Sequence, residues 1–157
     1  MNGNILQLVT FRLGNEEYAT EILKVQEINR MVEITAVPNS ASYLEGVINL
    51  RGKVIPVVNL RKKFGLAAKE NDDQSRIMIL DIQGITTGLV VDGVSEVLRI
   101  ESSTVEPPPP MASNVSTEFI NGIAKLENRL IILLDIDKLL GKAETTALVA
   151  ATSKQIP

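Results

Sequence analysis

The feature of this sequence that most constrains its fold is an internal repeat. Residues 43–65, YLEGVINLRGKVIPVVNLRKKFG, align with residues 119–141, FINGIAKLENRLIILLDIDKLLG, at an offset of 76 residues. Five of the 23 positions are identical, and nine further pairs exchange one apolar residue for another. A chain that repeats its apolar and glycine pattern in this way is expected to repeat the supersecondary unit that the pattern encodes.

A second match extends the repeat upstream. The segment VQEINRM at 25–31 aligns with VSEVLRI at 94–100 at an offset of 69, and the two share Val, Glu and Arg. The two offsets differ by seven residues, which the run PPPPMASNV can absorb as a longer, stiff connector in the second copy. We therefore expect two related halves, about residues 5–65 and 76–141.

Short apolar runs bounded by glycine predict strands. Residues 6–14 and 76–84 open the two halves as strands that end at a glycine turn. The segment EILKVQEI at 21–28 has apolar residues at near-helical spacing. Its counterpart in the second half, GLVVDGVSEV, carries two glycines among valines, which disfavours a helix. We therefore expect strands in both copies. RKKFG and DKLLG predict short helical turns that end at glycine.

The segment GVINLRGKVIPVVNL predicts a β-hairpin. Its turn contains Gly52, and the aligned residue in the second copy is Asn128; both residue types tolerate a positive φ. Pro56 cannot donate a ladder hydrogen bond, so the strand is predicted to be an edge at that residue, or to be bulged.

Length and composition favour one mainly β domain. Apolar residues make up 45% of the 157 residues, and most of them are aliphatic. Many short strands with turn signals predict either a pair of small barrels or a sandwich. We expect a single domain over residues 1–142. Residues 143–157 are predicted to form a tail that is a frayed helix or disordered.

Catalytic, metal-binding and cofactor-binding motifs are absent from the sequence. The chain has no His and no Cys, which removes the commonest general base and the usual zinc ligands. A catalytic pair would require two of the carboxylates that follow apolar runs to converge. These are Asp81, Asp92, Asp135 and Asp137. Solvated strand ends are the simpler interpretation, so we expect a protein that is not an enzyme and has no cofactor.

The sequence also shows no targeting or membrane segment. Its N-terminus, MNGNILQ, lacks the basic and apolar regions of a signal peptide, and no apolar run is long enough to span a bilayer. We therefore expect a soluble cytoplasmic protein.

Cations distinguish the first copy of the hairpin from the second. The stretch from Arg51 to Lys63 carries a charge of +5, and the aligned stretch from Glu127 to Leu139 carries −1. Because Arg51 aligns with Glu127, folding is expected not to need a cation there, and a recognition role is predicted. Free variation of a polar turn residue is the bland alternative.

A different function for the same cations is a small-barrel module that binds nucleic acid through residues 51–63. The net charge of −3 disfavours it, because phosphate binding usually requires a basic excess. Aromatic residues, which stack on bases, make up only 3% of the chain.

Three segments resemble the CheW-like domain family of bacterial chemotaxis. They are NLRGKVIPVVNLRKKFG, EEYATEILKVQEI upstream and GLVVDGVSEVL downstream. The likeness runs in order from about Leu6 to Gly141, and the pattern N-L-R-G-x-[IV]-[IVL]-P is specific. Asn59 departs from the family, which more often has Asp at that position.

The resemblance implies two intertwined, five-stranded β-barrels of SH3-like type. It also implies a non-catalytic adaptor or scaffold that couples transmembrane chemoreceptors to the histidine kinase CheA in chemotaxis signal transduction, a two-component system. One surface is expected to bind the regulatory domain of CheA, and another the cytoplasmic tip of methyl-accepting chemoreceptors. These partners would recruit the cytoplasmic protein to membrane-associated receptor arrays.

The resemblance further implies which residues bind partners. Arg51 in NLRG corresponds to the arginine that couples the family to receptors. Val25 and Glu27 in VQEI, and Gly46 in EGV, match positions associated with partner binding. Val97 in VSEV matches such a position on the other half, which implies a receptor groove between the halves.

Overall fold

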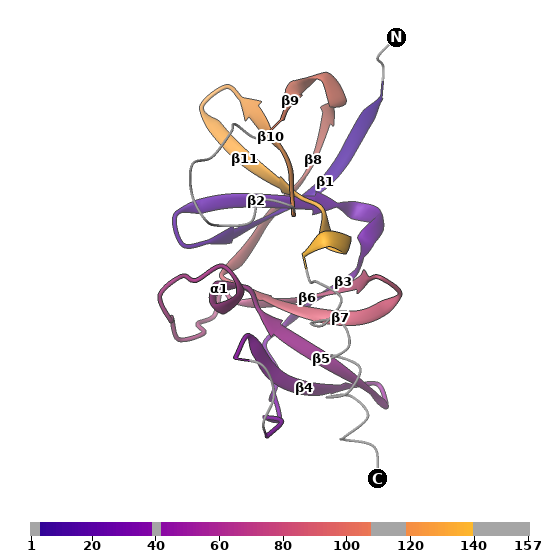
Figure 1. The fold of residues 1–157 in the computed structure, drawn as a ribbon, viewed down its shortest axis with the longest axis vertical. Helices are drawn as coiled ribbons and strands as arrows, with labels where there is room; N and C mark the ends of the chain where they lie inside the picture. The colour runs from indigo at the N-terminus through magenta and orange to yellow at the C-terminus, as the bar shows by residue number, and fades with distance from the viewer. Residues whose placement is uncertain (1–3, 39–41, 108–118, 140–157) are drawn as a thin grey trace.

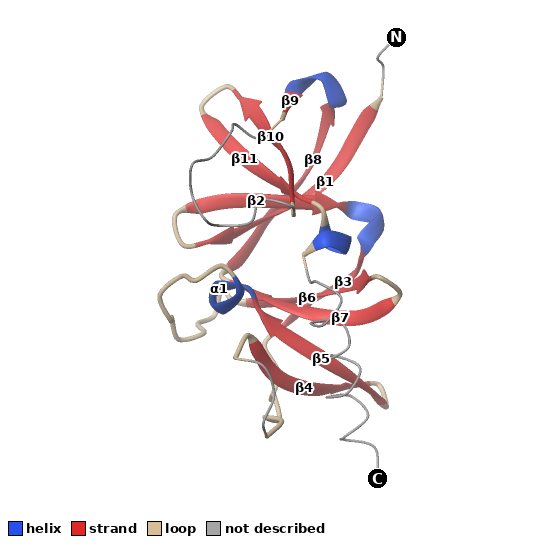
Figure 2. Ribbon diagram, viewed as in Figure 1, coloured by secondary structure: helices blue, strands red, loops and turns tan. Residues whose placement is uncertain are grey.

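Strands dominate the computed structural model, which describes residues 4–38, 42–107 and 119–139. They form two sheets, one above the other in Figures 1 and 2. The first sheet has the order β8 (Gly93–Glu101), β1 (Ile5–Leu13), β2 (Glu16–Glu21), β11 (Arg129–Leu134), β10 (Ile120–Leu126), β9 (Val105–Glu106). The second has the order β3 (Val25–Arg30), β6 (Arg76–Ile82), β7 (Ile85–Val91), β5 (Lys53–Asn59), β4 (Leu44–Leu50). The predicted mainly β class is confirmed.

The two halves of the sequence exchange their third strands. β3 lies in a different sheet from β1 and β2, and it pairs antiparallel with β6 of the second half. In the same way β8 of the second half pairs antiparallel with β1 of the first half. The hairpins follow the same rule, since β5 lies parallel to β7 and β11 lies parallel to β2. Each sheet therefore contains strands of both halves, which agrees with the intertwined architecture that the resemblance implies.

Three apolar cores stabilise the fold, and one of them joins the two sheets. One lies within the second sheet, around Val57 and Ile79, and one within the first sheet, around Leu8 and Ile131. The third and largest contains residues of both sheets, Phe11 among them, and packs one sheet against the other. Pleating explains this arrangement, because alternate residues of one strand point to opposite faces.

Short helical segments lie where the chain leaves a sheet. They are η1 (Ile22–Lys24), α1 (Leu60–Lys63), η2 (Ser102–Thr104) and η3 (Ile136–Lys138). The predicted turns after both hairpins are confirmed by α1 and η3, which are capped by the side chains of Asn59 and Asp135. The predicted strand over 21–28 is wrong for Ile22–Lys24. The chain crosses there from the first sheet to the second, and the 3-10 turn makes that change of direction.

Two local predictions for the hairpins have different outcomes. β5 as a whole is an interior strand, flanked by β4 and β7, but Pro56 lies where it has a neighbour on one side only. The parallel ladder with β7 begins only at Val57, so at Pro56 the strand pairs with β4 alone and the missing donor is tolerated. Gly52 has the expected positive φ of 86°. Asn128 does not have a positive φ. Among the described residues, Arg51 and Gln83 are the only residues other than glycine that do.

Two predictions concern residues that the structure does not describe. The tail over 143–157 lies outside them, as does most of the run PPPPMASNV, and the domain limits of 1–142 stay a prediction. In the described part of the chain, no helix has the length and apolar character needed to cross a bilayer.

Candidate protein-interaction site

Arg51 lies at the tip of the β4–β5 hairpin. Arg51 and Gly52 have consecutive positive φ values of 51° and 86°, the pattern of a type I′ turn, which suits the twist of two-residue hairpins. The side chain of Asn49 accepts the Gly52 N–H at 2.9 Å. Asn, Asp and Gly are the residue types that favour this conformation, so the turn itself does not select an arginine.

Arg51 forms a forked ion pair with Glu27. Its Nη1 donates to Glu27 Oε1 at 3.3 Å, and its Nη2 donates to Oε2. β3 and β4 are the two edge strands of the second sheet, so the pair joins opposite edges. The bridge between Thr35 and Val47 ties β4 to the segment that follows β3. The hydrogen bonds from Arg51 lower the pKa of Glu27, and those to Glu27 raise the pKa of Arg51.

The fork leaves the guanidinium open to solvent. The Arg51 side chain is 70% exposed and that of Glu27 is 27% exposed. Two residues that the sequence separates by 24 positions thus form one charged feature at the surface. A guanidinium so placed can make a further charge-assisted hydrogen bond to a partner's carboxylate or carbonyl.

Gly46 has a backbone role. Its φ is 147°, and a Cβ at this position would lie 2.1 Å from the carbonyl oxygen of Thr35. The ladder between β4 and β5 shifts register here, between Leu44 and Gly46. Any side chain would therefore push β4 away from the segment that joins it to β3.

Val25 and Val97 lie in different sheets. Val25 is half-buried opposite Leu80 on β6 and packs against the large shared core. Val97 is 57% exposed on β8, opposite Val9. Sequence reasoning missed Ile28, which aligns with Val97 at the offset of 69 and is also exposed. The repeat was the signal that could have found it.

A groove in the first sheet was not predicted either. It has a volume of about 360 Å³ and is lined by Ile5, Leu6, Gln7, Glu21, Ile22, Leu23 and Arg99. Leu23 in η1 is 92% exposed at its rim. Val97 lies two residues from Arg99 on β8, on the same face of the strand. Exposed aliphatic side chains gathered in this way are typical of a surface that binds another protein.

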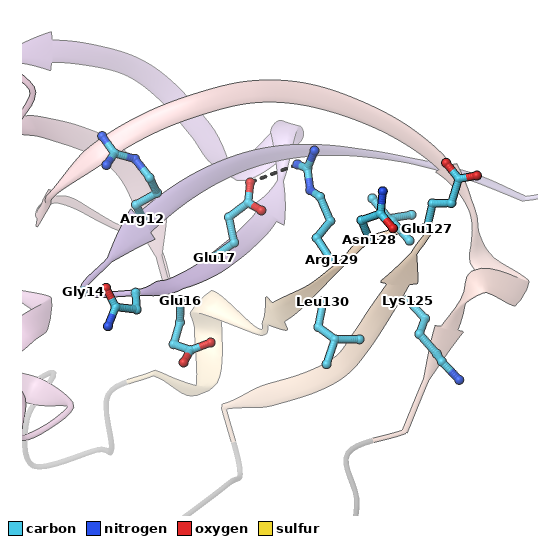
Figure 3. A pocket seen from close by; sticks show the side chains of 11 residues that line it. Arg12, Gly14, Glu16, Glu17, Lys125, Glu127, Asn128, Arg129 and Leu130 are labelled. Atoms are coloured by element: carbon cyan, nitrogen blue, oxygen red, sulfur yellow. Dashed lines mark hydrogen bonds and ion pairs between the residues drawn. The ribbon is translucent and has the colours of Figure 1, made fainter.

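A larger open groove lies at the turns of the first sheet (Figure 3). Its volume is about 680 Å³, and it runs between the β1–β2 turn and the β10–β11 turn. Arg129 donates to Glu17 at 2.9 Å and to Glu96 at 2.7 Å. Glu127, which aligns with Arg51, lies at the turn beyond it.

The basic run of the first copy is mostly neutralised within the chain. Arg61 pairs with Asp92 at 2.7 Å, and Lys62 pairs with Glu45 at 2.8 Å. Since Arg51 is paired as well, residues 51–63 do not present five unpaired cations to a polyanion. Three of the five cations thus have a carboxylate partner within the chain, which disfavours the nucleic-acid alternative.

The four carboxylates considered for catalysis have structural partners. Asp81 accepts the N–H of Gly84, and Asp135 accepts that of Asp137. Asp92 pairs with Arg61, as described above, and Asp137 pairs with Lys24. Across residues 4–38, 42–107 and 119–139, no cluster of acidic side chains is suited to hold a metal ion. The carboxylates therefore stabilise turns and junctions.

Comparison with known proteins agrees with this picture of a binding protein. A family model described as "CheW-like domain" matches residues 7–144. The chain belongs to the CheW-like domain family. CheW is a family of chemotaxis scaffold proteins and not of enzymes. The predicted resemblance is thus confirmed over nearly the full length of the chain.

Individual CheW proteins match closely. The chemotaxis protein CheW of Klebsiella aerogenes is 39% identical over 94% of this chain and 89% of its own length. That of Thermotoga maritima is 36% identical over 85% of this chain and 87% of its own length. The crystal structure of the scaffolding protein TtCheW from Thermoanaerobacter tengcongensis superposes with a TM-score of 0.81. It is 39% identical and covers 92% of this chain and 96% of that one.

Proposed function

We propose that this chain is a non-catalytic adaptor that couples transmembrane chemoreceptors to the histidine kinase CheA. The observation that carries the proposal is the forked pair of Arg51 and Glu27, which presents an exposed guanidinium on a CheW-like domain. Such a group is suited to bind a carboxylate or carbonyl group of a partner. The protein would act in the cytoplasm and be recruited to membrane-associated receptor arrays by these partners.

The receptor contact is proposed to combine apolar and charged recognition. A receptor tip is a helical hairpin, and an amphipathic helix binds a groove through its apolar stripe. The groove at Ile5 and Leu23, with Val97 beside it, offers aliphatic surface for that stripe. Arg51 would add a forked contact to a receptor carboxylate or backbone carbonyl.

The kinase contact is proposed at an apolar end of a barrel. The regulatory domain of CheA is related to CheW, so a domain of the same fold can pack there in a pseudo-symmetric way. Val25 and Gly46, which both belong to the second sheet, would take part in this contact. Gly46 would act through the backbone path of β4, because it has no side chain to offer.

A three-component pull-down tests the proposal. The CheA regulatory domain is immobilised, and a receptor tip fragment is added with and without this chain. We expect the receptor fragment to be retained only when the chain is present. Retention without the chain, or none with it, would contradict the adaptor role. In the same assay, Arg51→Glu is expected to retain less receptor fragment. Lys69→Glu is its matched control, because it makes the same change of charge in a loop outside the site.

A further inference from the structure

Asp137 joins three segments that are far apart in the sequence. Its Oδ2 accepts Lys24 Nζ at 2.7 Å, and its Oδ1 accepts the backbone N–H of Gln83 at 3.0 Å. The Gln83 side chain in turn donates to the Asp137 carbonyl at 2.7 Å. The junction therefore ties η1 and the β6–β7 turn to η3.

The segment that this junction holds carries the most exposed apolar side chain of the candidate site. Leu23 is 92% exposed, so packing does little to fix its direction. Its direction depends on the backbone of η1. Ile22 anchors one side of η1 in the large shared core, and Lys24 anchors the other side at Asp137.

The second crossover of the fold has a junction of the same design with the charges exchanged. Asp92 accepts the Gly14 N–H at 2.8 Å and Arg61 Nη1 at 2.7 Å. Gly14 aligns with Gln83 at the offset of 69, and Arg61 aligns with Asp137 at the offset of 76. In both halves one carboxylate thus ties a hairpin turn to a crossover and to the segment after the other hairpin.

The two junctions differ in burial and in what they carry. The side chains of Arg61 and Asp92 are 16% and 13% exposed, whereas those of Lys24 and Asp137 are 39% and 40% exposed. Only the Lys24 junction borders a 3-10 turn with a protruding leucine beside the groove. The buried junction therefore suits a purely structural role, and the exposed one is placed to control a surface.

We propose that Asp137 is a positioning residue for partner binding, which acts through Lys24 to fix η1 and so to hold Leu23 at the rim of the groove. The proposal rests on the proposed adaptor function and deepens it, since the groove is the apolar part of the receptor contact. Asp137 itself need not touch the receptor.

Hydrogen exchange on the free, full-length chain tests the positioning step. The reporter is the Val25 N–H, which donates to the Ile22 carbonyl and closes η1. Asp137→Asn keeps an oxygen that can accept the Gln83 N–H but loses the charge that holds Lys24. We expect Val25 to exchange about tenfold faster in this variant and in Lys24→Met, because local opening becomes easier.

The matched control is Asp72→Asn. Asp72 also accepts a lysine, Lys69 at 3.0 Å, and a backbone N–H, that of Gln74 at 2.8 Å, but in a loop away from η1. Exchange at Val25 is expected to stay unchanged in this variant. An unchanged rate in Asp137→Asn as well would overturn the proposal.

Affinity for a receptor tip fragment tests the consequence. Asp137→Asn, Lys24→Met and Leu23→Ala should each weaken binding about three- to tenfold, because the partner must then order η1 or do without the leucine. Asp72→Asn should bind like the wild type. Faster exchange with unchanged affinity would overturn the role in binding. If the wild type bound no receptor fragment, the adaptor function and this role would both be contradicted, while the exchange rates would still show whether Asp137 holds η1.

Discussion

The two sheets each place an arginine–glutamate contact at a hairpin, and the contacts differ in one respect. Glu27 in the second sheet and Glu96 in the first are aligned by the repeat. Glu27 is held by Arg51 at the tip of the turn, whereas Glu96 is held by Arg129, two residues further along the hairpin than the aligned position Glu127. The two halves therefore share the position of the glutamate but not the position of the arginine that pairs with it.

This difference separates a structural cation from an accessible one. Arg129 bridges two carboxylates, Glu17 and Glu96, and its side chain is 37% exposed. Arg51 holds one carboxylate and is nearly twice as exposed. Both sheets thus satisfy a glutamate at the same place in the fold. The second does so with the more exposed of the two guanidiniums.

The largest effect is expected from the glycines that precede the two arginines. A Cβ at Gly46 would lie 2.1 Å from the Thr35 carbonyl oxygen, at a strained φ. A Cβ at Gly122, whose φ is not positive, would lie 2.4 Å from the Val105 methyl and 2.9 Å from the Glu106 carbonyl oxygen. We expect Gly46→Ala to lower the free energy of unfolding by about 3 kcal/mol and Gly122→Ala by about 1–2 kcal/mol. Urea unfolding measures both. A loss of unfolding free energy at Gly46 that is equal to or smaller than the loss at Gly122 would contradict this difference between the two hairpins.

The next effect concerns the arginines themselves. Arg129→Met leaves Glu17 and Glu96 without their shared cation. We expect the free energy of unfolding to fall by only about 1 kcal/mol, because solvent screens these partly exposed ion pairs. Arg51→Met should change the melting temperature by less than about 2 °C. Thermal melts of both variants and the wild type, at low and at high salt, measure the two effects on stability. A larger loss for Arg51 would make it the structural cation.

The smallest effect is a dependence on pH. Hydrogen bonds from Arg51 lower the pKa of Glu27 below its ordinary value of 4.5. A carboxylate whose pKa is lower in the folded state stabilises the fold above the unfolded value, and this contribution is lost as the pH falls through the folded value. The difference in melting temperature between wild type and Glu27→Gln should therefore be fully present above pH 4.5 and shrink as the pH falls below it, through the folded value. A difference that does not shrink below pH 4.5 has another cause.

The sequence predicted the parts of the fold that depend on local pattern. The repeat located the hairpins and the turns after them, and aligned Gly46 with Gly122, whose bulges correspond. It also aligned Glu27 with Glu96. Pattern alone did not predict that third strands change sheets, because pairing partners are set by tertiary packing. The 3-10 turn at Ile22–Lys24 was missed for the same reason.

The candidate site was predicted less completely. The comparison of Arg51 with Glu127 suggested that no cation is needed there, and it did not take Arg129 into account. A side chain as long as arginine reaches the same carboxylate from a neighbouring position, so alignment position by position misses the substitution. The junctions at Asp92 and Asp137 are similar, because they exchange acid and base between halves. No single aligned column contains that signal.

The most direct test of the proposal that Arg51 is a recognition residue is the affinity of Arg51→Glu for a receptor tip fragment. Titration of the full-length variant, beside wild type and Lys69→Glu, gives the comparison, and a thermal melt shows whether each protein is folded. We predict that Arg51→Glu melts within about 2 °C of the wild type and binds the fragment at least tenfold more weakly, while Lys69→Glu binds normally. A folded Arg51→Glu protein with wild-type affinity, or a variant that unfolds, would contradict a recognition role for Arg51.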